Sequence, residues 1–392
     1  MRRCLLNDEG KVTAYLHPTD STKTDTGAAV DLTGASGMVM VEIPKHYRKF
    51  EFDGQTVTAL ISLYPLPGFH EVPKMYRSAY EATVDRTVSA TPKLASVVNT
   101  TAAFRGGNNN AAYDGTYRTF LGLPATAISL TNFRKYARNR GTAGLNGAGW
   151  NGDLYAAQLA TYWLYIIEYA NRDSQKAFNA EPTSEGYKQG GLGDGVTTWN
   201  SSEWDTYNGY YPVIPCGVTN SLGNRTGVVE HTVSNGDKIS KTFSVPSYRG
   251  IENPYGHIWS WTDGCKCEIQ SETDGGLAKF YVCDDPAKFQ DSSYNDYQQR
   301  GLLPRKEGCV KRMMIGEYGE NMPTEVGGNS ATYYCDYYYT NIPASGTAMR
   351  GVLFGGYALN GASAGLSCTN TNNAATYTTA YFGSRLCFIP EA

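Results

Sequence analysis

An uncharged stretch near the C-terminus places the strongest constraint on how this chain folds. Between Arg350 and Arg385 there is no Lys, Arg, Asp or Glu, and most residues are Gly, Ala, Ser, Thr, Asn or Tyr. Charged side chains normally keep polar surface segments solvated. Tyr mixed with Ser, Gly and Asn is the composition of antibody paratopes, because Tyr offers a wide contact area at low entropic cost. The stretch indicates either an exposed binding surface or a polar loop without a function.

Two sets of residues alternate within this stretch. Alternate residues of an extended strand point to the same side. We therefore expect both sets, together with Tyr357, to lie partly exposed on one face, with Cys368, Leu386 and Phe388 buried behind it. The sets are Ser367, Thr369 and Thr371, and Tyr377, Thr379 and Tyr381.

Several apolar runs bounded by turn residues predict strands. A buried strand is expected after Gly37 and ends at Pro44, and the Asn235-Gly236 pair predicts a hairpin turn. Residues 286–331 are expected to be rich in loops. The other expected strands span Thr56–Tyr64, Met75–Ala82, Val228–Val233, Lys238–Phe243, Cys265–Ile269 and Lys279–Cys283.

Two segments predict helices. The first runs from Ser129 to Gly141, with these two residues as caps. The second runs from Asp153, a candidate N-cap, to about Ser174, and its apolar residues recur with a helical period. This apolar face is predicted to pack against a sheet that contains Trp259 and Trp261. Its residues are Ala156, Ala160, Trp163, Ile167 and Ala170.

The composition disfavours several classes of function. The chain has 392 residues and a net charge of −3, which indicates no general attraction to nucleic acid or to anionic membranes. No apolar run approaches the ~20 residues of a membrane helix, so no membrane insertion is expected. The start, Met1 to Leu6, lacks the apolar core of a secretory signal. We expect synthesis in the cytoplasm without a signal peptide.

The cysteines and histidines do not form a familiar reactive motif. The nine cysteines are irregularly spaced, and Cys265-Lys-Cys267 lacks the spacing of a zinc-binding pair. They are interpreted as reduced, packed thiols, so we expect neither a metal nor a cofactor. His257 precedes a Trp-rich segment and is interpreted as a structural histidine.

The frame of the C-terminal stretch resembles the variable region of proteins that are diversified by retroelements, a family of ligand binders that includes phage tropism determinants. Residues 163–175 resemble the second helix of that family and of the related formylglycine-generating enzymes, and the Trp259-Ser-Trp261 segment resembles a core strand of the family. The frame consists of Arg350, Gly355-Gly356, Gly361, Ala364-Gly365, Asn372-Asn373-Ala374 and Gly383-Ser384-Arg385-Leu386.

The resemblance implies an α+β, C-type-lectin-like fold with two helices, mixed and antiparallel sheets and loop-rich insertions. Residues 1–40 would be a short β-rich lead-in, a candidate arm for attachment or oligomerisation. Residues 41–392 would form the ligand-binding domain, with an insertion at about 179–245 and a variable region at about 333–388. An alternative binding site in the insertion would use Trp199, Trp204 and Tyr210.

The positions that vary in the family mark the ligand-binding residues that the resemblance implies. None of them is catalytic, and none is expected to bind a metal. They are Tyr337, Tyr338, Tyr339, Phe354, Tyr357, Leu359, Asn360, Ser363, Ser367, Thr369, Thr371, Tyr377, Thr379 and Tyr381.

The function that this resemblance implies is non-enzymatic recognition of a host cell-surface receptor, protein or glycan, by a phage tail protein. Its other partners would be tail proteins and further copies of itself, with a trimer favoured, and it would reside in the virion. Two alternatives are a formylglycine-generating type of oxidase, in which two of Cys335, Cys368 and Cys387 would bind copper, and a purely structural tail subunit. A calcium-dependent lectin is disfavoured, because Glu252-Asn-Pro and Trp150-Asn-Gly depart from the sugar-binding motifs of that class.

Overall fold

The computed structural model describes residues 1–107, 120–141, 149–178, 213–329, 334 and 336–390. The expected insertion is therefore described from residue 213 onward. Trp199, Trp204 and Tyr210, which formed the alternative binding site, lie outside the described residues, as does Cys335.

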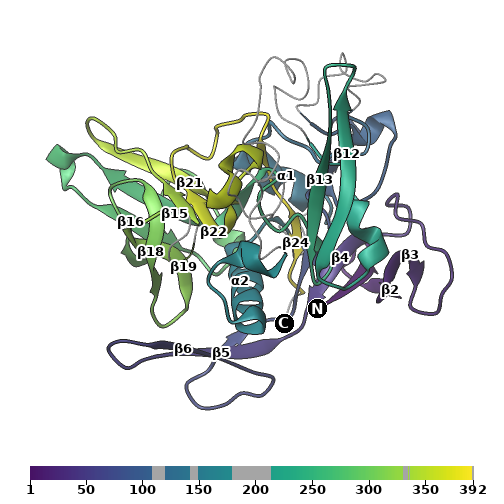
Figure 1. Cartoon of the computed structure of the whole chain (residues 1–392). Coiled ribbons are helices and arrows are strands. Elements are labelled where there is room, and N and C mark those ends of the chain that lie inside the picture. Colours follow the sequence, from purple (N-terminus) through teal and green to yellow (C-terminus); the bar gives the residue numbers. More distant parts are fainter. Residues whose placement is uncertain (108–119, 142–148, 179–212, 330–333, 335, 391–392) are drawn as a thin grey trace.

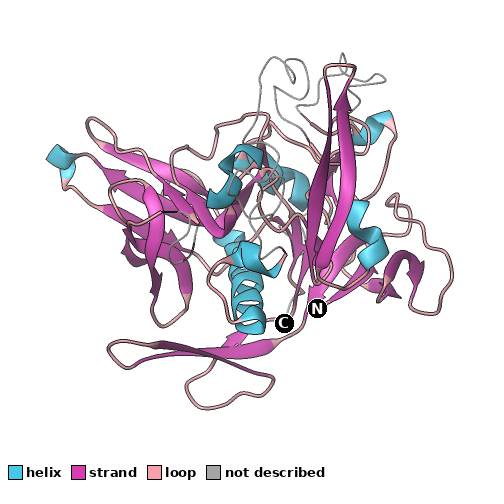
Figure 2. Ribbon diagram, in the orientation of Figure 1, coloured by secondary structure: helices cyan, strands magenta, loops and turns pink. Residues whose placement is uncertain are grey.

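The described chain is mostly β, so the expectation of an α+β fold is wrong. Figure 2 shows strands throughout the molecule, with α1 (Leu130–Arg138) and α2 (Tyr155–Tyr169) as its α-helices. The main error lies in residues 286–331, where strands replace the expected loops. Bulges interrupt the pairing of β18 with β19, which hides the alternation in the sequence. These strands are β17 (Gln298–Leu302), β18 (Gly308–Ile315) and β19 (Glu320–Val326).

A seven-stranded sheet joins the N-terminal and C-terminal parts of the chain, in the order β11-β24-β8-β4-β1-β2-β3. The expected buried strand before Pro44 is confirmed as β4, and β1 pairs with it, so the N-terminal strands form part of this sheet. The strands are β1 (Arg2–Leu6), β2 (Val12–His17), β3 (Asp20–Thr24), β4 (Met38–Ile43), β8 (Met75–Ser78), β11 (Trp150–Gly152) and β24 (Leu386–Phe388).

A nine-stranded sheet carries the C-terminal stretch, in the order β17-β16-β15-β21-β22-β20-β18-β19, with β23 beside β15. The expected strands at Cys265–Ile269 and Lys279–Cys283 are confirmed, and they pair with one another. β22 lies in the interior of the sheet, between β21 and β20, and Figure 1 shows it beside β21. The remaining strands are β15 (Trp259–Gln270), β16 (Ala278–Val282), β20 (Tyr337–Tyr339), β21 (Thr347–Gly355), β22 (Gly365–Asn370) and β23 (Phe382–Gly383).

Smaller sheets flank these two. The predicted hairpin at Asn235-Gly236 is confirmed, and Gly236 supplies the positive φ of +60° that the tight turn requires. The strands of these smaller sheets are β5 (His46–Phe52), β6 (Val57–Ser62), β7 (His70–Val72), β9 (Thr83–Asp85), β10 (Lys93–Ala95), β12 (Gly227–Asn235), β13 (Ile239–Tyr248) and β14 (Ile251–Glu252). Short 3-10 helices are η1 (Ala102–Phe104), η3 (Ser174–Ala177), η4 (Val218–Leu222), η5 (Glu272–Asp274), η6 (Pro286–Lys288) and η7 (Ala358–Ser363).

The two helices begin differently from one another. In α1, the hydroxyl of Ser129 accepts a hydrogen bond from the Asn132 amide, which confirms the predicted N-cap. The predicted cap of α2 is wrong, because its N-cap is Leu154 and the Asp153 carboxylate instead binds the buried guanidinium of Arg77 at 2.6 Å. Among the described residues, no helix is long and apolar enough to span a membrane.

The buried face of α2 is only partly the predicted one. Ala160 and Trp163 are buried, whereas Ile167 is 40% exposed. The Trp163 ring packs against Phe50 of β5 in a tilted arrangement, with ring centroids 4.6 Å apart, and donates from Nε1 to the Gly319 carbonyl. The predicted packing of α2 on the sheet that contains Trp259 and Trp261 is confirmed, because Trp163 shares a core cluster with Cys265 and Cys267 of β15. The two Trp rings themselves lie in a separate core cluster with α1.

Candidate ligand-binding site

Five tyrosines of the C-terminal region form a connected group of aromatic rings, which we call the tyrosine surface. It comprises Tyr337, Tyr339, Tyr357, Tyr377 and Tyr381, which are half-buried or exposed. The rings of Tyr337 and Tyr339 lie 4.6 Å apart, and those of Tyr357 and Tyr381 stack at the same distance. The described segments that carry these residues contain no charged side chain between Asp336 and Arg385 except Arg350.

Buried aromatic residues form the base of the tyrosine surface. The Trp259 ring contacts Tyr339 edge-on at 5.8 Å and Tyr357 face-on at 6.4 Å. The Phe382 ring contacts Tyr381 at 5.2 Å and Tyr377 at 5.7 Å. The exposed rings are therefore fixed to the core by aromatic contacts that favour defined orientations.

Backbone hydrogen bonds hold the same residues in place. The Trp259 amide donates to the Tyr381 carbonyl at 2.9 Å, and the Ala358 amide donates to the His257 carbonyl at 3.1 Å. The His257 ring is buried between the Glu81 carboxylate and the Ile214 amide. Both ring nitrogens are engaged, which agrees with the structural role expected for His257.

Asn360 links two members of the tyrosine surface. Its Oδ1 accepts from the Tyr357 amide and its Nδ2 donates to the Tyr339 hydroxyl, each at 2.7 Å. Three further positions that the resemblance implies are also half-buried. They are Leu359, Ser363 and Thr379. Leu359 packs against a small apolar cluster that includes Val233 of β12.

The remaining implied positions are buried, and the expectation that Ser367, Thr369 and Thr371 are exposed is wrong. The alternation misled because β22 has a strand on each side and the sheet is covered on both faces, so the side chains on both faces of β22 are buried. Thr369 donates to the Ser367 carbonyl, and Thr371 contacts the Tyr338 hydroxyl. The buried positions are Tyr338, Phe354, Ser367, Thr369 and Thr371, each 0–1% exposed.

The residues expected behind this surface are confirmed as core. Cys368 and Leu386 are fully buried, and Phe388 is 5% exposed. Every cysteine that the structure describes is buried and unpaired. Burial raises the pKa of the Cys368 and Cys387 thiols, which disfavours the thiolate that a nucleophile or a copper ligand requires.

The frame residues have structural roles. The buried Arg385 guanidinium donates to the carbonyls of Glu252 and Asn253, each at 2.6 Å, which fixes the chain after the tyrosine surface. At Gly365 a Cβ atom would lie 1.9 Å from Asp336 Oδ1, so a side chain there is excluded. These contacts explain why the exposed tyrosines are set in a frame of Gly and Arg.

Asp336 supplies a testable feature beneath the surface. It is 1% exposed, its Oδ2 accepts from the Ser367 amide at 2.6 Å, and its Oδ1 has no hydrogen-bond donor among the described residues. Burial raises the pKa of Asp336 well above its ordinary value, and Asp173 adds to the effect. In the unfolded chain the carboxyl therefore ionises at a lower pH than in the folded protein.

We expect Asp336→Asn to raise the free energy of unfolding at pH 7 by ~1 kcal/mol or more, because it removes a buried charge with an unpaired oxygen. The free energy of unfolding of the wild type falls as the pH rises above 3.8, because the unfolded chain releases this proton at a lower pH than the folded protein. Urea denaturation at pH 3 and pH 7 measures this. An equal increase in the free energy of unfolding at both pH values would contradict the raised pKa of Asp336.

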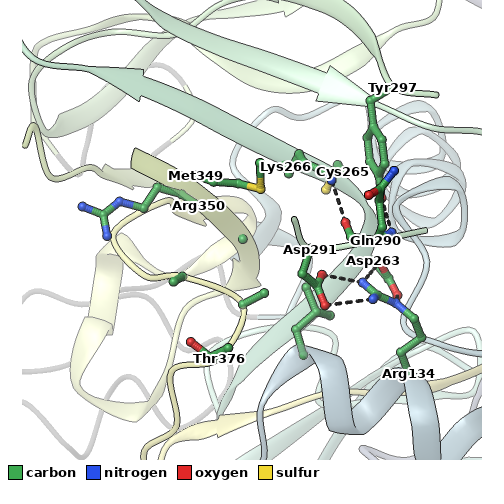
Figure 3. A pocket seen from close by; sticks show the side chains of 14 residues that line it. Arg134, Asp263, Cys265, Lys266, Gln290, Asp291, Tyr297, Met349, Arg350 and Thr376 are labelled. Atoms are coloured by element: carbon green, nitrogen blue, oxygen red, sulfur yellow. Dashed lines mark hydrogen bonds and ion pairs between the residues drawn. The ribbon is translucent and has the colours of Figure 1, made fainter. Parts of the chain in front are cut away.

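A cavity of about 80 Å³ is lined in part by residues 374–376, which precede Tyr377 of the tyrosine surface in the sequence. It lies between α1, β15, β21 and these residues (Figure 3). Met349, Leu130 and Tyr297 form apolar parts of its wall. The cavity offers a recess for a small chemical group.

Paired charges line the inner wall of the cavity. Arg134 donates to Asp263 at 2.5 Å and to Asp291 at 2.8 Å, as Figure 3 shows. Burial opposes the ionisation of Asp291, but the hydrogen bonds from Arg134 outweigh it and keep the pKa of Asp291 below its usual value. Lys266 donates to the carbonyls of Gln290 and Ser293, and burial lowers its pKa to about 8. These pairings make the wall a rigid lining.

Sequence reasoning missed this cavity and the platform role of Trp259 and Phe382. The charged residues come from α1, β15 and residue 291, which are far apart in the sequence and show no common motif. Trp259 had been interpreted as core, which is correct, but its contacts with Tyr339 and Tyr357 were not foreseen. The density of Tyr in the C-terminal stretch was the signal that located the site.

Comparisons with known proteins give distant structural likenesses. No family model matches the chain, and no curated protein sequence matches it. The structure of PvdO from Pseudomonas aeruginosa aligns at 12% identity, covering 90% of this chain and 95% of that one, with a TM-score of 0.36. The U1 variant of the Major Tropism Determinant aligns at 12% identity and a TM-score of 0.30, and the I1 variant at 11% and 0.24. Each variant match covers 88% of this chain and 72% of the other.

Proposed function

We propose that this chain is a non-enzymatic ligand-binding protein that recognises a cell-surface receptor through the tyrosine surface. The observation that carries the proposal is the continuous series of ring contacts from Tyr337 to Tyr377 over buried Trp259 and Phe382. Tyr presents a large, rigid contact area, and aromatic anchors commonly carry most of an interface's energy.

The surroundings of the tyrosine surface support display of exchangeable side chains. Tyr377 is 47% exposed, and the backbone near Tyr357 and Tyr381 is held by hydrogen bonds that do not use their side chains. A change of side chain at these positions alters the contact surface while the scaffold stays in place. The cavity lined by residues 374–376 offers a recess for a small group of the same ligand.

The finer part of the proposal comes from the sequence resemblance. We place the protein in the tail of a phage or prophage, where it acts as a tropism determinant that a retroelement diversifies at its C-terminal surface. Two of the structural likenesses are to proteins whose titles name a tropism determinant, but their TM-scores of 0.30 and 0.24 are too low to add weight. Repeated copies of the site on one assembly would raise avidity by ~10²–10⁴.

The test is binding of the fluorescently labelled chain to a panel of intact bacterial strains, measured by flow cytometry. We expect saturable binding to at least one strain, with competition by unlabelled protein. Binding that Tyr377→Ala and Tyr381→Ala leave unchanged would move the site elsewhere on the molecule. An absence of saturable binding across a panel that contains the strain of origin would contradict receptor recognition.

Diversification of the C-terminal surface by a retroelement can be tested in the DNA beside the gene. We expect a near-copy of the segment that encodes residues 333–385, differing at adenines, next to a reverse transcriptase gene. Among the described positions, the differences should fall on Tyr357, Tyr377 and Tyr381 rather than on the buried Ser367 and Thr369. Neighbouring DNA that contains neither element would contradict diversification and leave the binding proposal standing.

A further inference from the structure

A β-ribbon formed by β5 and β6 projects along the lower edge of the molecule in Figure 1. Its base is fixed to the body, because Phe50 packs on Trp163 and β7 pairs with His46–Arg48. Beyond Arg48 the ribbon has two strands, and residues 51–58 are all exposed. Two-stranded ribbons are marginally stable alone, and a further strand stabilises them.

The outer edge of this ribbon is open and uncharged. β6, with the sequence Val-Thr-Ala-Leu-Ile-Ser, pairs with β5 on one side, and within the described residues no strand lies on its other side. Proteins normally protect exposed edge strands with charges or proline, because unpaired backbone groups recruit other strands. Exposed outer strands of other sheets follow that rule: β3 carries Asp20 and Lys23, β12 carries Glu230, β17 carries Arg300 and β19 carries Pro323 and Glu325.

Exposed apolar side chains lie at both ends of β6. At the tip of the ribbon, Phe52 is 69% and Val57 is 38% exposed. In the loop that follows β6, Leu63, Tyr64 and Leu66 are 70%, 71% and 48% exposed. Phe52 and Val57 are cross-strand partners, so they share one face of the ribbon. An open edge and apolar side chains therefore coincide on one projecting element.

We propose that β6 pairs antiparallel with β6 of a second copy of this chain and joins the two ribbons into one continuous sheet. The strand is self-complementary about a two-fold axis at its centre. An axis at Ala59 sets Val57 opposite Ile61 and Thr58 opposite Leu60, and an axis at Leu60 sets Ala59 opposite Ile61 and Thr58 opposite Ser62. Every pair is apolar or hydroxyl-bearing, and no like charges meet, as an isologous interface requires.

A second copy of this chain is favoured over a strand of another protein, because the ribbon itself carries both apolar groups that would meet in the contact. Antiparallel pairing places the tip residues Phe52 and Val57 of one copy near the Leu63–Leu66 loop of the other. Both apolar groups would then be covered by the same contact. This interface uses β6 and leaves the tyrosine surface free, so it is independent of the proposed function.

The experiment measures the mass of the full chain by sedimentation equilibrium over a concentration series. We expect a reversible dimer of the 42.8 kDa chain. The variant Thr58→Lys with Leu60→Lys should weaken dimerisation about tenfold or more, because it sets like charges opposite or beside one another across the axis. The matched control, Thr232→Lys with Ser234→Lys on exposed positions of β12, should dimerise like wild type.

A cysteine cross-link gives a second measurement that does not rely on the lysine variant folding. Leu60→Cys should form a covalent dimer under mild oxidation, whereas Thr232→Cys should not, and the cysteines that the structure describes are buried. A wild-type monomer at all concentrations would overturn the proposal. So would an oligomer that the lysine variant leaves intact, or equal cross-linking at residues 60 and 232.

Discussion

Replacing Tyr357, Tyr377 and Tyr381 together with alanine is expected to abolish measurable binding to the receptor-bearing cells. Each aromatic anchor contributes ~2 kcal/mol or more in a typical interface, which corresponds to a loss of ~30-fold in affinity per residue. The rings of Tyr357 and Tyr381 stack on one another and contact Trp259 and Phe382, so their removal also exposes apolar surface. We therefore expect a modest fall in Tm together with retained folding. Titration on cells and a thermal melt measure the two effects separately.

The matched control is Tyr318→Ala, because Tyr318 is 38% exposed but contacts Arg300 and His70, away from the tyrosine surface. It should bind like wild type. If the triple variant binds as wild type does, the tyrosine surface is not the site. If it unfolds, the single Tyr377→Ala variant decides, because that ring is the most exposed of the three.

Trp163→Ala is expected to lower the free energy of unfolding by ~3–5 kcal/mol, the range for deleting a buried large aromatic side chain. The Trp163 ring is 6% exposed, packs against Phe50 and donates to the Gly319 carbonyl at 2.6 Å. Its loss leaves a cavity where α2, β5 and the turn before β19 meet. Urea denaturation monitored by circular dichroism measures the change.

Ile167→Ala is the control on the same helix. Ile167 is 40% exposed, so we expect a cost below ~1 kcal/mol, as for most surface substitutions. The helical period of the sequence placed both residues on one buried face and so predicts similar costs. The observed packing, in contrast, predicts a large cost at Trp163 alone. Equal costs at the two positions would contradict the observed packing of α2.

The helices and the most regular strands could be predicted because local signals specify them. Ser129 caps α1 as its hydroxyl and position suggest, and Asn235-Gly236 makes the expected hairpin turn. The end of α2 was placed too late, at about Ser174, whereas Ala170 already adopts a left-handed conformation with φ of +47°. No Gly or Pro marks that point in the sequence.

Long-range pairing accounts for the remaining errors. Asp153 was expected to cap α2, but its carboxylate neutralises Arg77 of β8, a partner that no local pattern indicates. Ser367, Thr369 and Thr371 alternate like a surface strand, yet β20 and β21 flank them and bury both faces. The composition of the C-terminal stretch located the tyrosine surface, whereas the separation of exposed from buried positions required the order of strands in the sheet.

The most direct test of the binding surface is a scan of all substitutions at residues 337–339 and 354–381, with folding and cell binding measured on the same variants. Folding is read from resistance to protease, and binding from sorting on receptor-bearing cells. We predict that changes at Tyr357, Tyr377 and Tyr381 alter binding in variants that still fold, whereas changes at Ser367 and Thr369 act through loss of folding. Binding that stays at the wild-type level across folded variants of the tyrosine surface would contradict the account.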